Sequence, residues 1–140
     1  MLARCSNKRS LPSNELPQWR QVIACALEVR RDLGYGFLER VYENALVVEL
    51  AKSGVRVVQQ LPLKVRFRGV IVGDYIADLI IDEKILVEIK TIEVVMPVHR
   101  AQVLNYLRAT GYTVGLLLNF GPGRLTVNRV VCGHNESIPI

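Results

Sequence analysis

Residues 75–90 read YIADLIIDEKILVEIK, and this stretch decides the fold. Two short apolar runs flank a charged triplet at residues 82–84, a pattern typical of two antiparallel strands joined by a tight turn. Three charged residues interrupt the apolar runs, namely Asp78, Glu88 and Lys90. The stretch therefore predicts a β-hairpin that carries two acids and a lysine.

The register of this hairpin decides where its charges lie. With a three-residue turn, the predicted partners are Ile81 with Ile85, Asp78 with Glu88, and Ile76 with Lys90. Side chains alternate across a strand, so the three charged residues share one face with Ile76, Ile80 and Leu86. The other face is wholly apolar and holds Tyr75, Ala77, Leu79, Ile81, Ile85, Val87 and Ile89. A slip of one residue would put charge on this apolar face, so the pattern argues against it.

The two facing carboxylates need a positive partner. At roughly 5 Å between Cβ atoms they repel, and at an effective dielectric of roughly 20 this costs on the order of 3–4 kcal/mol. Paired carboxylates suit Mg²⁺ or Mn²⁺, which prefer oxygen ligands. The alternative is a solvated sheet face on which Lys90 pairs with Glu88 or Asp78.

Composition places the chain among globular proteins. It has 140 residues, of which 50% are hydrophobic and 22% charged, as expected for one domain. Neither a membrane span nor a signal-peptide core is recognisable, so we expect a cytoplasmic protein with no membrane partner. The three cysteines follow no ligand spacing and are expected to be free thiols.

Positive charge is concentrated late in the chain. The formal net charge is +5, and the 18 basic residues comprise 13 arginines and 5 lysines. Arginine suits phosphate contacts, so a polyanionic partner is compatible, although modest positive charge also occurs in proteins that bind no nucleic acid. Residues 94–135 contain no acid but include Arg100, Arg108, Arg124 and Arg129. This third of the chain is expected to present a basic surface.

The chain divides into an arm, a domain and a tail. Residues 1–14 are polar and basic and are expected to form a flexible arm, with phosphate contact left open. The domain is predicted over residues 15–133, and residues 134–140 form a tail.

Helical spacing of apolar residues predicts two early helices, at residues 15–33 and 37–52. The inner face of the second would carry Tyr42, Leu46, Val47 and Leu50. Glu39 lies one turn ahead on the same stripe. With Gly36 as N-cap, Glu39 would occupy N3, where a carboxylate favours the helix dipole. A structural cap and a role in a site are both open for it.

A third helix is predicted over residues 97–110, where Pro97 suits the first turn. His99, Gln102 and Tyr106 share one of its faces. The glutamine and tyrosine are suited to hydrogen-bonding a phosphate, or they line the helix surface. A lone histidine is more often a surface residue than a catalyst.

The remaining chain is extended. Strands are predicted at residues 55–60, 63–68, 112–120 and 125–131, with a break at Pro62 and a turn at residues 68–69. Lys64, Arg66 and Arg68 make one strand face basic. The order of elements predicts an α/β or α+β fold, a mixed sheet flanked by helices.

The charged hairpin resembles the core of the PD-(D/E)XK nuclease superfamily, in which an acid on one strand precedes an acid-x-lysine on the next. Here Asp78 precedes Glu88-Ile89-Lys90, and Ala77 occupies the position of the family's proline, which is not a ligand.

Three further motifs strengthen this resemblance. Residues 36–42, GFLERVY, match the motif that names the GxxExxY protein family. Gln102 followed by Tyr106 resembles a glutamine-x-x-x-tyrosine motif of several nuclease branches. Residues 115–121, GLLLNFG, resemble the late strand of the GxxExxY family.

The resemblance implies a restriction-endonuclease-like fold and a metal-dependent nuclease that hydrolyses DNA phosphodiester bonds. The implied ligands of Mg²⁺ or Mn²⁺ are Asp78, Glu88, the backbone carbonyl of Ile89 and Glu39. Lys90 would orient or activate the attacking water. The implied substrate-positioning residues are Gln102, Tyr106 and His99.

Other functions stay open. A nuclease-like module that binds nucleic acid or assembles a complex without cleaving is one, because 140 residues leave little room for a target-reading insertion. A structural protein with an ion-pair network on its hairpin is another. A homodimer, which would suit the cutting of two strands, is also expected.

Overall fold

The computed structural model describes residues 17–133, so the arm at residues 1–14 and the tail at residues 134–140 lie outside the described part. The elements in order are α1 (Gln18–Leu33), α2 (Glu39–Ala51), β1 (Val57–Phe67), β2 (Val70–Ile81), β3 (Ile85–Lys90), α3 (Pro97–Thr110), β4 (Val114–Asn119) and β5 (Thr126–Val131). The strands form one sheet in the order β1-β2-β3-β4-β5. Among the strands that the structure describes, only the β3–β4 pair is parallel. The predicted mixed sheet flanked by helices is confirmed.

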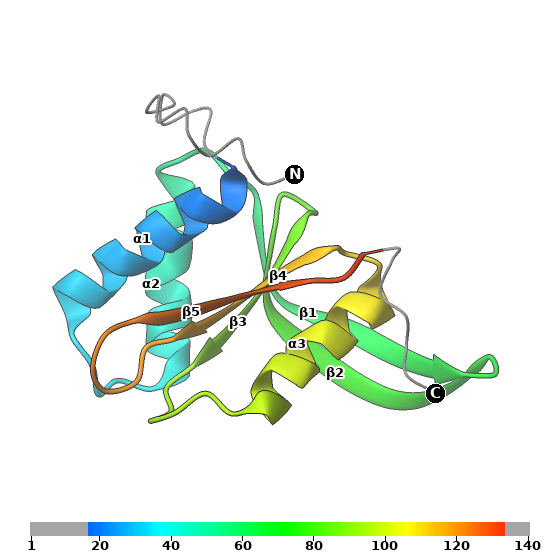
Figure 1. Cartoon of the computed structure of the whole chain (residues 1–140). Helices are drawn as coiled ribbons and strands as arrows, with labels where there is room; N and C mark the ends of the chain where they lie inside the picture. Colours follow the sequence, from blue (N-terminus) through cyan, green and yellow to red (C-terminus); the bar gives the residue numbers. More distant parts are fainter. Residues whose placement is uncertain (1–16, 134–140) are drawn as a thin grey trace, which may run out of the picture.

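Both faces of the sheet are covered in its middle. Helices α1 and α2 lie on one face and α3 lies on the other (Figure 1). Successive residues of β4 serve the two cores: Leu116 packs under α1 and α2, whereas Leu117 packs with Val103 and Leu107 of α3. This double burial explains why β4 reads as a continuous apolar run.

Helix α3 makes the parallel connection between β3 and β4, which needs a crossover rather than a tight turn. Its bounds agree with the prediction: Pro97 is its first residue, and Gly111 ends it with a left-handed φ of 84°. No helix within residues 17–133 is long and apolar enough to cross a membrane. Cys25 and Cys132 are free thiols, as predicted, whereas Cys5 lies outside the described residues.

The turn between β2 and β3 is confirmed, but the strands stay paired over a shorter distance than predicted. The paired residues are Leu79 with Val87, Ile80 with Leu86, and Ile81 with Ile85. Ile76 pairs with Pro62 of β1 instead of Lys90, and Lys90 pairs with Asn119 of β4. The strands diverge because β2 continues with β1 in a long hairpin that projects from the sheet (Figure 1).

The prediction of one continuous apolar face on the hairpin is wrong for Tyr75 and Ala77. Tyr75 and Ala77 lie on the α3 side, whereas Leu79 lies in the core under α1 and α2. The alternation breaks at Asp78. Its cross-strand neighbour Gln60, between the flanking residue pairs, has a left-handed φ of 55°. A local backbone rotation thus overrides the period of two.

Of the two predictions made for β1 and its following turn, one is wrong and one is confirmed. The predicted break at Pro62 is wrong, because β1 runs through Pro62 without interruption. This strand lies at the edge of the sheet, where a missing backbone N–H is tolerated. The predicted turn at residues 68–69 is confirmed, and both of its residues have positive φ, as a type I′ hairpin turn requires.

Candidate active site

Asp78 and Glu88 lie together where β2 and β3 diverge. The backbone N–H of Ile89 donates to Asp78 Oδ2 over 2.7 Å, and the backbone N–H of Asp78 donates to Glu88 Oε1 over 3.1 Å. Each carboxylate thus binds a backbone donor beyond the last paired residues of the hairpin. The two acids lie together as predicted. However, they are joined by hydrogen bonds from backbone N–H groups to side chains, not by backbone pairing between the strands.

Burial makes both carboxylates hard to ionise. Glu88 is only 5% exposed, and burial followed by the nearby charge of Asp78 raises its pKa to about 8. Burial also raises the pKa of Asp78, which the hydrogen bond from Ile89 partly offsets. The acid pair therefore favours a bound proton or an added cation.

Lys90 is the nearest basic residue in the sequence, two positions after Glu88 on β3. Its charge lowers the pKa of Glu39, Asp78 and Glu88, so it lies within electrostatic reach of all three. However, no ion pair within 4.0 Å joins Lys90 to a carboxylate among residues 17–133. The alternative of a direct Lys90 ion pair with either acid is not found.

Glu39 approaches the acids from the first turn of α2. The helix begins at Glu39 itself, so the prediction that Gly36 is the N-cap and Glu39 the N3 residue is wrong. Gly36 has a φ of 110° and Leu38 is extended, which delays the helix start. Burial of its carboxyl group raises the pKa of Glu39, and Asp78 raises it further against the opposing effect of Lys90.

The fit to a metal can be judged from these donors. Within residues 17–133, no three His, Cys, Asp or Glu side chains converge well enough to hold an ion. Mg²⁺, however, keeps several waters and is commonly bound by one or two carboxylates together with substrate phosphates. Half-buried Asp78 and buried Glu88, which have no ion-pair partner among residues 17–133, fit that requirement of two carboxylates.

The sequence did not reveal a buried polar link behind Asp78. Glu43 of α2 is 3% exposed and accepts hydrogen bonds from Gln59 over 2.8 Å and from Gln60 over 2.7 Å. Gln60 Nε2 also donates to Asp78 Oδ1 over 3.4 Å. A sequence signal existed for Glu43, which lies four residues after Glu39 on the same helix face.

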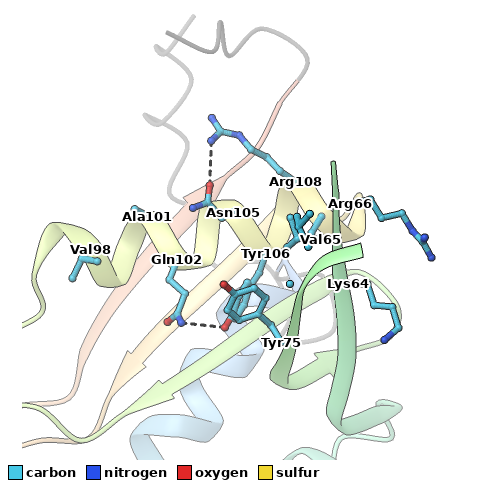
Figure 2. A pocket seen from close by; sticks show the side chains of 13 residues that line it. Lys64, Val65, Arg66, Tyr75, Val98, Ala101, Gln102, Asn105, Tyr106 and Arg108 are labelled. Carbon is cyan, nitrogen blue, oxygen red and sulfur yellow. Dashed lines mark hydrogen bonds between the residues drawn. The ribbon is translucent and has the colours of Figure 1, made fainter. Parts of the chain in front are cut away.

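The predicted positioning residues of α3 divide into two groups. Gln102 Nε2 donates to the hydroxyl of Tyr106 over 3.0 Å, as Figure 2 shows. Tyr106 is buried, and burial together with the charge of Glu88 raises its pKa, so it lies within electrostatic reach of the acid pair. His99 instead accepts the backbone N–H of Met96 over 2.8 Å on Nδ1 and thereby caps the start of α3.

A groove of about 780 Å³ separates α3 from the β1–β2 hairpin. Figure 2 shows Tyr75 of the hairpin beside Tyr106 and Gln102 of the helix. Neither acid lines this groove; it lies beside them and shares Tyr106 as a boundary.

Comparison with known proteins agrees with this geometry. The family model of the PD-(D/E)XK nuclease superfamily matches residues 17–130. No curated protein matches the chain. The crystal structure of SSO0001 is similar, with a TM-score of 0.52 and 18% sequence identity, over 81% of this chain and 58% of that one. At this identity the likeness concerns the fold alone, and the chain spans little more than half the length of SSO0001.

Proposed function

Because this chain belongs to the PD-(D/E)XK nuclease superfamily, we propose that it is a metal-dependent nuclease that hydrolyses DNA phosphodiester bonds. The observation that carries the proposal is the pair of carboxylates formed by half-buried Asp78 and buried Glu88, which lie near Lys90 and make no ion pair with it among residues 17–133. The motif at residues 36–42 supports a place in the GxxExxY family within that superfamily.

Asp78 and Glu88 hold Mg²⁺ or Mn²⁺ in this proposal, and the backbone carbonyl of Ile89 is a third donor. The N–H of Ile89 donates to Asp78, and the two polar groups of one strand residue point to the same edge. Glu39 acts from α2 through a water molecule. When bound, such a metal lowers the pKa of a coordinated water and polarises the phosphoryl oxygen.

Lys90 orients the attacking water and stabilises the charge that develops on the phosphate. Its support is its position within electrostatic reach of Glu39, Asp78 and Glu88. Gln102 and Tyr106 position the DNA strand, since their hydrogen-bonded side chains lie next to the acids. His99 assists through the start of the same helix, which it caps.

Cleavage assays on single- and double-stranded DNA with Mg²⁺ or Mn²⁺ test the proposal. Asp78→Asn and Glu88→Gln are expected to abolish cleavage, because each replaces a metal ligand by an amide of the same shape. Asp32→Asn, which removes an exposed acid at the end of α1, is the matched control and keeps wild-type activity. Cleavage that persists in both site variants would come from a contaminant and would remove the assignment.

A second function, a nuclease-like module that binds nucleic acid or assembles a complex without cleaving, is favoured by one observation. Within residues 17–133 no three potential ligands converge on a metal position. DNA binding that weakens with salt, without cleavage of DNA or RNA in either metal, supports this function. Calorimetry that detects no divalent-metal binding favours a purely structural hairpin.

We also propose a homodimer in the cytoplasm. The supporting feature is the free edge of β2 over residues 70–77, which β3 does not pair and where Val70, Val72 and Ile76 are exposed. Unpaired strand edges with apolar side chains associate readily. Light scattering that detects only monomer at micromolar concentration removes the dimer.

A further inference from the structure

We propose that the groove between the β1–β2 hairpin and α3 binds a single-stranded stretch of nucleic acid next to the acid pair. The inference deepens the proposed nuclease function and rests on it for the choice of DNA as substrate. The groove measures about 780 Å³ and is open beside the acids rather than over them. Its walls come from β1, β2 and α3, and Figure 2 shows side chains of these elements around it.

The charges of the groove suit a polyanion. Its lining includes Lys64 and Arg66 from β1 and Arg108 from α3, and none of its lining residues is acidic. Lys64 is partly neutralised by an ion pair with exposed Asp74. Arg66 and Arg108 have no ion-pair partner among residues 17–133, so they are the cations available to phosphates.

An aromatic platform accompanies these charges. The ring of Tyr75 is 5.6 Å from that of Tyr106, at an angle of 49°. Tyr106 is buried, whereas Tyr75 is 47% exposed, so the inner ring supports an outer ring that solvent reaches. Basic side chains around an accessible aromatic ring are the usual means of binding single strands, because bases stack on the ring while phosphates follow the cations. A duplex hides its base faces and cannot use Tyr75 in this way.

The groove and the acid pair are continuous. Tyr75 precedes Asp78 by three residues on β2, which corresponds to about 10 Å along a strand. Tyr106, which accepts a hydrogen bond from Gln102, contacts the ring of Tyr75 and lies within electrostatic reach of Glu88 and Asp78. A strand whose phosphate lies at the acids can therefore continue into the groove.

Binding without metal tests the inference separately from catalysis. The probe is a fluorescent oligothymidylate, compared with a duplex of equal length, measured by anisotropy on the full chain in a chelating buffer. The single strand is expected to bind more tightly. Tyr75→Ala weakens its binding about tenfold or more, as expected for the loss of one stacked base, and Tyr75→Phe does not.

The basic side chains are tested through the salt dependence of binding. Arg66→Gln is expected to reduce the slope of log affinity against log salt by about 0.7, the contribution of one phosphate on a single strand. Lys84→Gln removes one positive charge from the β2–β3 turn and is the matched control, with an unchanged slope. Thermal unfolding verifies that each variant is folded, and Arg66, as an exposed residue, is replaceable without loss of the core.

Several results overturn the inference: equal affinity for duplex and single strand, unchanged binding in Tyr75→Ala, or equal slopes in Arg66→Gln and Lys84→Gln. A protein that binds the single strand through these residues but never cleaves upholds the groove and removes the nuclease proposal. A protein that cleaves DNA while its Tyr75→Ala variant binds normally upholds the nuclease proposal and removes the groove as a binding site.

Discussion

The carboxylates of Asp78 and Glu88 each accept a hydrogen bond from a backbone N–H of the opposite strand, where β2 and β3 diverge. The N–H of Asp78 binds Glu88 Oε1, and the N–H of Ile89 binds Asp78 Oδ2. These bonds hold the carboxylate of Glu88 in a buried position and that of Asp78 in a half-buried one. Glu88 Oε2 accepts no hydrogen bond from residues 17–133, so it is free for a ligand.

The acid pair should make stability depend on pH in the absence of metal. The pKa of Glu88 rises on folding from 4.5 to about 8, so the folded state holds the Glu88 proton more tightly than the unfolded state. The contribution of this proton to the free energy of unfolding is fully present below pH 4.5 and is lost as pH rises through 8. Glu88→Gln removes the buried charge and is expected to be more stable than wild type above pH 8, by on the order of 1–3 kcal/mol. Urea unfolding at several pH values measures this. A variant that loses stability at every pH contradicts the burial argument.

Divalent metal should stabilise the protein and compete with protons. Ligand binding raises the free energy of unfolding by about 2.7 kcal/mol at 100-fold excess over the dissociation constant. The gain from Mn²⁺ is expected to increase with pH, because the raised pKa of Glu88 keeps the ligand protonated at lower pH. Asp78→Asn abolishes the gain and Asp32→Asn keeps it. Thermal unfolding with and without Mn²⁺ decides the matter.

Gln60 should act as a positioning residue for Asp78. It joins Asp78 to buried Glu43, and its left-handed φ costs on the order of 1 kcal/mol. Gln60→Gly removes both the side chain and the backbone strain, so we expect near wild-type stability but weaker Mn²⁺ binding, by roughly one hydrogen bond or about 1 kcal/mol. Calorimetric titration measures it.

The neighbouring glutamine supplies the control for that experiment. Gln59 donates to Glu43 and Asn44 but not to Asp78. Gln59→Ala should therefore leave Mn²⁺ affinity unchanged. Equal weakening in both variants would instead assign the effect to Glu43 alone.

Lys90 should contribute to catalysis more than to metal binding. Lys90→Met is expected to lower kcat by about 100-fold or more, as for the loss of one preorganised donor in a water-poor site. Because its charge lowers the pKa of Glu88 and Asp78, the variant also needs higher pH to bind metal. Lys84→Met, in the exposed turn, is the control. Wild-type kcat in Lys90→Met would exclude a role for the amine.

A single methyl group added at Gly121 should disturb the loop that follows Lys90. A Cβ at Gly121 would lie 2.0 Å from the carbonyl oxygen of Ile92, whose backbone is also held by Asn119. Gly121→Ala is expected to destabilise the protein by on the order of 2 kcal/mol or more, since backbone must move. Gly133→Ala, where a Cβ meets nothing within 4 Å, is the control. Denaturant unfolding of both variants measures the difference.

Local patterns in the sequence determined much of this protein. The charged triplet at residues 82–84, between two apolar runs, predicts the β2–β3 turn and its register, and a period near 3.6 with a proline and a glycine predicts the bounds of α3. The meeting of Asp78 and Glu88 follows from the same register. These features depend on residues that are close in the chain, so the local sequence pattern is enough to predict them.

Only the tertiary structure decided what surrounds the acids. The rotation at Gln60, the pairing of Ile76 with β1 and the late start of α2 at Glu39 all come from backbone conformations that side-chain alternation does not record. Glu43 approaches Asp78 through Gln60 because α2 packs against the hairpin. Contacts between such distant segments depend on how helices and strands pack against one another, and local sequence patterns do not determine that packing.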